Sequence, residues 1–261
     1  MAIGLIIIGD EILSGRRVDQ HFAKVVQLLG ARGLQLDWAE ILGDDPARIV
    51  ATLRRTFASD DIVFCCGGIG ATPDDHTRQA AATALGLPLV MHEQGKHNIQ
   101  QRILHMGQES GQPADLESAE NQHRLQMAVF AEGAALIPNP YNNIAGFSLH
   151  RHYFVPGFPV MAWPMIEWVL DYHYADRFNL TPHLEQAVLV YEAAESALTP
   201  LMVALEAEYP RVKVFSLPSV GTATTRRHIE LGVKGDPEQT RTAFVQLCDR
   251  LTQMQVEFVH L

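Results

Sequence analysis

The residues of this 261-residue chain that are best suited to bind a ligand or a metal ion lie in three acidic turns. They are Gly9-Asp10-Glu11, Gly43-Asp44-Asp45 and the stretch GGIGATPDD at 67–75, and each follows a short apolar run. Glycines let backbone amides approach an anion closely, and a helix N-terminus favours negative charge. Clustered carboxylates repel one another unless a cation lies among them. The turns therefore predict a site that holds a phosphate together with a divalent metal ion.

The elements that carry these turns are expected to bring them together. Residues 3–8, 35–41 and 61–66 have the pattern of strands, and helical spacing follows each of them, at 20–32, 46–58 and 74–85. The first and third strands are apolar almost throughout, which is typical of strands covered on both faces. We predict an α/β fold of three layers, αβα, around a mostly parallel sheet. Ligands bind such sheets at the carboxyl ends of the strands, where the acidic turns would meet.

The third turn also has a purely structural interpretation. Thr72 would be the N-cap of a helix, Pro73 its first residue and Asp75 the partner of Thr72 in a capping box. Asp74 and Asp75 would then simply complement the helix dipole. Because three acidic turns occur, the metal and phosphate site is favoured. The loop matches neither the P-loop nor the dinucleotide fingerprint, and no nucleophile elbow is present, so metal-assisted hydrolysis or transfer at a phosphoanhydride is preferred to covalent catalysis.

Composition and charge narrow the class of protein. The net charge is −10 with only four lysines, so the bulk field repels phosphate backbones and no nucleic-acid partner is expected. No apolar run reaches the roughly 18 residues of a membrane span, and the first residues have no basic leader, so we expect a cytoplasmic protein with no membrane partner. The three cysteines have neither disulfide-framework nor metal-ligand spacing and are interpreted as core residues.

The chain is predicted to contain two domains. Residues 1–174 form the first, 175–184 a polar linker, and 185–261 a small α+β domain with the order strand, helix, strand, strand, helix. The second domain carries ten acidic against seven basic residues. That balance gives no electrostatic reason to expect a nucleic-acid partner for it.

The motifs resemble those of a known family. GDEILSG at 9–15, GDD at 43–45 and GGIGATPDDHTRQA at 67–80 are similar to the molybdopterin-binding domain of the MoaB/Mog type, whose loop runs GG-x-G-(P)-T-x-x-D-x-T. IPNP, AGF and VPGFP, between 137 and 159, resemble the competence/damage-inducible protein A (CinA) version of this domain. Residues 185–261 are similar, less specifically, to its KH-like middle domain. The chain resembles a short form without the deamidase domain of longer members.

This resemblance implies a nucleotide or pterin ligand, a divalent ion (magnesium, manganese or cobalt) and ADP-ribose pyrophosphatase activity. Two alternatives remain open: a molybdopterin adenylyltransferase-like enzyme, and a non-catalytic nucleotide- or pterin-binding protein. A KH-like fold would suggest RNA through a G-x-x-G loop, but the one G-x-x-G spacing in residues 185–261, GVKG at 232–235, falls within a predicted strand and not in a loop. The second domain is therefore interpreted as an oligomerisation module, and a homodimer is expected.

The site residues follow from the resemblance position by position. The catalytic pair is Asp44 and Asp75. The metal-binding set is Asp10, Glu11, Asp44, Asp74 and Asp75. The ligand-binding set is Gly67, Gly68, Gly70, Thr72, Thr77, Arg78, Asn121, Gly157 and Pro159. Arg78 is assigned by proximity, with a surface salt bridge as the alternative, and Asn121 could equally cap a helix.

Overall fold

The computed structural model describes residues 2–111, 114–180, 184–222 and 224–261. The chain divides into two compact units, Met1–Phe178 and Asn179–Leu261. Part of the expected linker, residues 181–183, lies outside the described residues. No described helix has both the length and the apolar character needed to cross a membrane.

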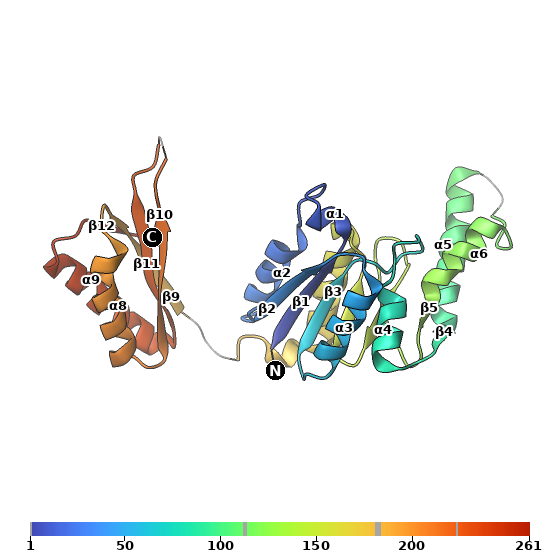
Figure 1. The fold of residues 1–261 in the computed structure, drawn as a ribbon, viewed down its shortest axis with the longest axis horizontal. Coiled ribbons are helices and arrows are strands. Elements are labelled where there is room, and N and C mark those ends of the chain that lie inside the picture. Colours follow the sequence, from blue (N-terminus) through green and yellow to red (C-terminus); the bar gives the residue numbers. More distant parts are fainter. Residues whose placement is uncertain (1, 112–113, 181–183, 223) are drawn as a thin grey trace. The chain divides into compact units, whose positions relative to one another are not determined.

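The first unit is built on a six-stranded sheet with the order β2-β1-β3-β8-β7-β6, of which Figure 1 labels β2, β1 and β3 side by side. The first four strands in this order run parallel, and β7 pairs antiparallel with both of its neighbours, β8 and β6. The strands are β1 Ile3–Ile8, β2 Trp38–Leu42, β3 Ile62–Cys66, β6 Ala135–Ile137, β7 Gly146–Leu149 and β8 His152–Val155. The predicted α/β class with a mostly parallel sheet is therefore confirmed.

Helices cover both faces of this sheet. The helices α2 His21–Gly30 and α7 Pro159–His173 pack on one face, and α3 Pro46–Phe57 and α4 Thr77–Leu85 pack on the other. Because successive strand side chains point to opposite faces, Cys66 joins the first core and Cys65 the second. Both cysteines are fully buried and free, as their apolar surroundings predict. The short helix α1 Asp10–Leu13 follows β1 directly.

One prediction for this unit was wrong, and one pair of strands was not predicted. The helix expected from residue 74 begins only at Thr77, because Asp75 N–H donates to the Thr72 carbonyl at 3.0 Å and closes a separate turn. A pair of short antiparallel strands, β4 Leu89–Met91 and β5 Val129–Ala131, was also missed. Between them lie α5 Glu93–Ser110, α6 Ala119–Leu125 and the 3₁₀ turn η1 Gln126–Ala128.

The second unit is a four-stranded antiparallel sheet, β10-β11-β9-β12, with two helices. Its elements are β9 Leu184–Tyr191, α8 Glu195–Glu208, β10 Val212–Ser219, β11 His228–Gly235, α9 Pro237–Gln253 and β12 Phe258–His260. Leucines of α8 and α9 pack against the valines and isoleucine of the sheet to form a separate core. The predicted order of elements is found, with β12 as an additional edge strand.

Candidate functional site

A cavity of about 400 Å³ lies at the carboxyl ends of the parallel strands. Residues that directly follow β1, β3 and β8 line it, and so does Asp44, two residues after β2. This is the edge at which ligands bind in open α/β sheets, and the volume lies in the usual range for small-molecule sites. The acidic turns of all three N-terminal strands therefore contribute to one hollow.

The carboxylates at this edge are close enough to interact. Glu11, Asp44, Asp74 and Asp75 all line the cavity, whereas Asp10 does not. Asp10 instead ties two turns together, because its N–H donates to Asp44 Oδ2 at 2.9 Å and the Asp44 N–H donates to Asp10 Oδ1 at 3.2 Å. Four of the five expected metal ligands thus line the cavity, whereas Asp10 is hydrogen-bonded to Asp44 outside the lining.

The cavity has a strongly negative wall. Burial raises the pKa of Asp44, and the charges of Asp10, Glu11 and Asp74 raise it further, against the bond from the Asp10 amide. Arg17 is the one basic side chain among the described residues that line the hollow. A phosphate would meet net repulsion from these side chains, so an anionic ligand must bring a cation or bind through backbone amides.

The glycine loop supplies such amides. Gly67 and Gly68 have φ angles of 110° and 68°, which side chains other than glycine's rarely adopt. A Cβ on Gly67 would lie 2.2 Å from the Ile8 carbonyl oxygen, so the loop packs directly on the end of β1. The backbone N–H groups of residues 68–71 have no hydrogen-bond partner within the described part of the chain. All four residues line the cavity, so this loop can bind an anion.

Thr77 and Arg78 support the loop, contrary to their assignment to the ligand. Thr77 is fully buried, and its hydroxyl donates to the Gly67 carbonyl at 3.0 Å while its N–H donates to Gly68 O at 2.9 Å. The buried Arg78 guanidinium donates to Gly70 O at 2.6 Å, to Val129 O at 3.2 Å and to the carbonyl of Gln126. Neither side chain lines the cavity. We therefore reassign both as residues that position the loop.

Asn121 and Pro159 also lie away from the cavity lining. Asn121 is buried in α6, where its amide donates to Asp115 O at 2.7 Å and its N–H donates to the Ser118 hydroxyl at 3.3 Å. Ser118, not Asn121, caps this helix. Pro159 is the first residue of α7, where its fixed φ favours helix initiation. The neighbouring Gly157 lines the cavity as expected, and so do Gly67, Gly68, Gly70 and Thr72.

One wall of the cavity was not assigned from the sequence. It is formed by the loop between β6 and β7, by parts of η1 and α7, and by the residue that precedes α7. Its residues are Met127, Asn139, Asn142, Ile144, Ala145, Phe158 and Met161. The IPNP motif at 137–140 marked this loop without indicating which side chain faces the ligand. A lining that combines these apolar side chains with the acidic ones fits a ligand that has a planar ring and a charged group.

The donor set suits a metal ion that arrives with its ligand. Within the described residues, no three histidine, cysteine, aspartate or glutamate side chains form a preassembled metal site. Magnesium is commonly bound by one or two carboxylates together with substrate phosphates. Asp44, with its neighbours Glu11 and Asp74, provides the carboxylates for this arrangement. The residues therefore fit an ion shared between protein and phosphate.

Comparison with known proteins agrees with this geometry. A sequence profile described as "Probable molybdopterin binding domain" matches residues 4–175. The chain belongs to this family. The resemblance read from the glycine loop is confirmed, and membership supports a role in binding a pterin or nucleotide.

Two curated relatives of this chain carry the name CinA-like protein. One from Anaeromyxobacter sp. strain Fw109-5 is 30% identical over 245 residues, which cover 87% of this chain and 57% of the relative. One from Anaeromyxobacter sp. strain K is 28% identical over 257 residues, covering 90% and 60%. The chain thus spans between one half and two thirds of the length of these two relatives.

Among solved structures, a protein named CinA from Thermoplasma acidophilum, described as of unknown function, matches with a TM-score of 0.54. It is 24% identical and covers 66% of this chain and 98% of its own. This likeness shows the shared fold.

Proposed function

We propose that the protein binds an ADP-ribose-type dinucleotide in this cavity and hydrolyses its pyrophosphate with a divalent metal ion. The observation that carries the proposal is the meeting, in one hollow, of four unbonded backbone N–H groups with the carboxylates of Asp44 and Asp75. Amides of this kind bind phosphate oxygens, and the carboxylates attract the cation that a pyrophosphate needs in an acidic pocket. Membership of the molybdopterin-binding family supports a ligand of this class.

In this proposal the backbone amides and the carboxylates have separate roles. The amides of residues 68–71 hold the phosphate oxygens on which negative charge develops. Asp44 holds a magnesium, manganese or cobalt ion, with Glu11, Asp74 and Asp75 beside it. When bound, such an ion polarises the phosphoryl group and lowers the pKa of a coordinated water. Hydrolysis adds water at one phosphorus and breaks the bridging P–O bond, which yields AMP and ribose 5-phosphate.

The test is an assay of purified protein with ADP-ribose in the presence of each metal. We expect release of AMP that requires metal and falls by at least about 100-fold in Asp44→Asn, which keeps an oxygen to accept the Asp10 amide. Asp45→Asn is the matched control, because Asp45 caps α3 outside the cavity lining and asparagine caps equally well. Equal loss in both variants would contradict the assignment.

Two other outcomes would replace the proposal. Binding of ADP-ribose without turnover under every metal would make the protein a nucleotide carrier or sensor. Consumption of ATP that appears only after a pterin acceptor is added would indicate adenylyl transfer to molybdopterin.

A further inference from the structure

The side-chain amide of Asn142 has a fixed orientation in the cavity wall. Its Oδ1 accepts a bond from the backbone N–H of Ile144 at 3.0 Å and another from Asn139 Nδ2 at 2.8 Å. A backbone N–H can only donate, so the atom facing Ile144 must be the oxygen. The Nδ2 group is therefore on the other side of the amide.

This Nδ2 group has hydrogen-bonding capacity to spare. Its one partner among the described residues is the Met161 thioether, at 3.4 Å, which is a weak acceptor. An amide nitrogen carries two N–H bonds, so at least one is available to a ligand. The adjacent Asn139 differs, because its Nδ2 donates to both Asn142 Oδ1 and Ile144 O while its Oδ1 accepts the Tyr141 N–H.

Apolar side chains share the cavity lining with Asn142. Ile144, Met161 and Phe158 line the same wall, and Phe158 is 55% exposed although it is large and apolar. A flat ring placed against them would bury apolar surface, and thioethers make favourable contacts with aromatic rings. The loop amides and carboxylates that would hold the phosphate end of a ligand come from other segments of the lining, the turns that follow β1, β2 and β3.

We propose that Asn142 recognises a ring nitrogen on the edge of adenine and is a specificity-determining residue of this site. The proposal rests on the proposed function, since it requires an adenine nucleotide in the cavity. Because the oxygen of the amide is already occupied, Asn142 presents only a donor. It therefore favours a ring edge that offers an acceptor. When that ring nitrogen is replaced by C–H, the N–H of Asn142 is left without a hydrogen-bond partner.

The experiment measures binding of AMP and of its 1-deaza, 3-deaza and 7-deaza analogues by calorimetry with magnesium present. AMP has no pyrophosphate bond, so it is not consumed. Asn142→Asp keeps the oxygen that Ile144 and Asn139 bond and removes the donor. Asn143→Asp adds the same charge at the next residue, which is exposed and lies outside the cavity lining. Thermal unfolding of both variants shows whether they fold as the parent does.

We expect one analogue to bind the parent about tenfold more weakly than AMP, the cost of one hydrogen bond in a built site. In Asn142→Asp that analogue should bind no more weakly than AMP, while Asn143→Asp should keep the parental difference. An unchanged analogue pattern in Asn142→Asp, or ribose 5-phosphate binding as tightly as AMP, overturns the role of Asn142 and leaves the phosphate site intact. A protein that binds neither AMP nor ADP-ribose overturns the proposed function itself.

Discussion

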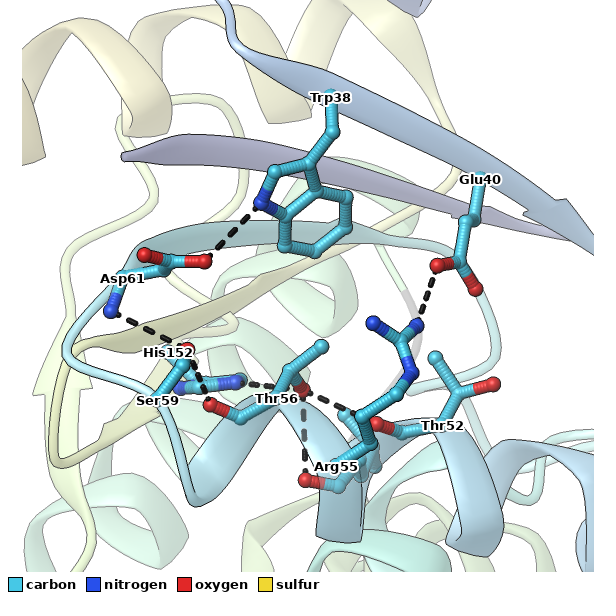
Figure 2. Close-up of polar contacts among 9 residues, drawn as sticks. Trp38, Glu40, Thr52, Arg55, Thr56, Ser59, Asp61 and His152 are labelled. Carbon is cyan, nitrogen blue, oxygen red and sulfur yellow. Dashed lines mark hydrogen bonds and ion pairs between the residues drawn. The ribbon is translucent and has the colours of Figure 1, made fainter. Parts of the chain in front are cut away.

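His152 permits a quantitative test of how burial and protonation affect the stability of the first unit. It opens β8, is 1% exposed, and its Nε2 lies 2.8 Å from Thr56 Oγ1 (Figure 2). The Thr56 hydroxyl lies 3.2 Å from the Thr52 carbonyl, which can only accept, so the hydroxyl donates there and accepts from His152. His152 Nδ1 then carries a lone pair that is buried without a partner among the described residues.

Burial lowers the pKa of His152 from 6.5 to about 3, and the charge of His150 acts in the same direction. The unfolded chain therefore takes up a proton as the pH falls below about 6.5, whereas the folded chain does not until about pH 3. The stability that depends on a neutral His152 is thus fully present above pH 6.5 and is lost progressively as the pH falls toward 3. From these two values, His152 lowers the free energy of unfolding by about 2 kcal/mol between pH 7 and pH 5.

The substitution His152→Phe removes the proton site and keeps a ring beside Phe57, whose centroid is 4.1 Å away. At pH 7 we expect the variant to be about 1 kcal/mol less stable than the parent, because Thr56 loses a hydrogen bond. At pH 5 the parent has lost about 2 kcal/mol and the variant has not, so the variant should be the more stable of the two. The difference in stability changes sign between these pH values.

Urea unfolding followed by tryptophan fluorescence measures this change. All three tryptophans, Trp38, Trp163 and Trp168, lie in the first unit, so their signal reports that unit alone. His97→Gln is the control, because it removes an exposed histidine of α5 and leaves the buried one. The reasoning is refuted if the free energy of unfolding of His152→Phe falls between pH 7 and pH 5 as steeply as that of the parent.

Two further predictions concern the loop beneath the cavity. Gly68→Ala should abolish AMP binding and cost about 1–3 kcal/mol of stability, since φ is 68° and the new Cβ would lie 2.2 Å from the Thr77 hydroxyl oxygen. Gly133→Ala, at a φ of 84° with open space, should cost stability but preserve binding in the same titration. Arg78→Met should lower the free energy of unfolding by about 2–4 kcal/mol, because it removes the hydrogen bonds that the buried guanidinium donates to three part-buried carbonyls. Exposed Arg54→Met should change it by less than about 0.5 kcal/mol in urea titrations.

Several parts of the fold could be predicted from the local sequence pattern. Strands β1 and β3 are uninterrupted apolar runs, so their burial in a parallel sheet could be predicted. β1 ends just before Gly9 and Asp10, and β3 ends at the glycine loop that leads to Asp74, so their common edge could be predicted as well. The strands β4 and β5 were missed because each has three residues, too few for a period to appear. They close the insertion that contains α5 and α6, and their pairing depends on residues about 40 positions apart.

The candidate site likewise contains residues that the local sequence could indicate and residues that it could not. Local sequence indicated Asp44, Asp75 and the glycines of 67–70, because turn chemistry places them at strand ends. It could not indicate Asn142, which reaches the cavity from the loop between β6 and β7. Nor could it show that Arg78 turns inward, since the carbonyls of Gln126 and Val129 that bind its guanidinium come from 48 and 51 residues further along the chain.

The sequence by itself determined the layered α/β fold, the acidic tips of its strands and the family to which the chain belongs, because these depend on side-chain periodicity and on turns of a few residues. Only the tertiary structure decided which polar side chains face the cavity and which ones support its loop. The physical reason is that a buried hydrogen bond goes to whichever group the packing brings within 3 Å, and neighbours along the chain do not specify that group.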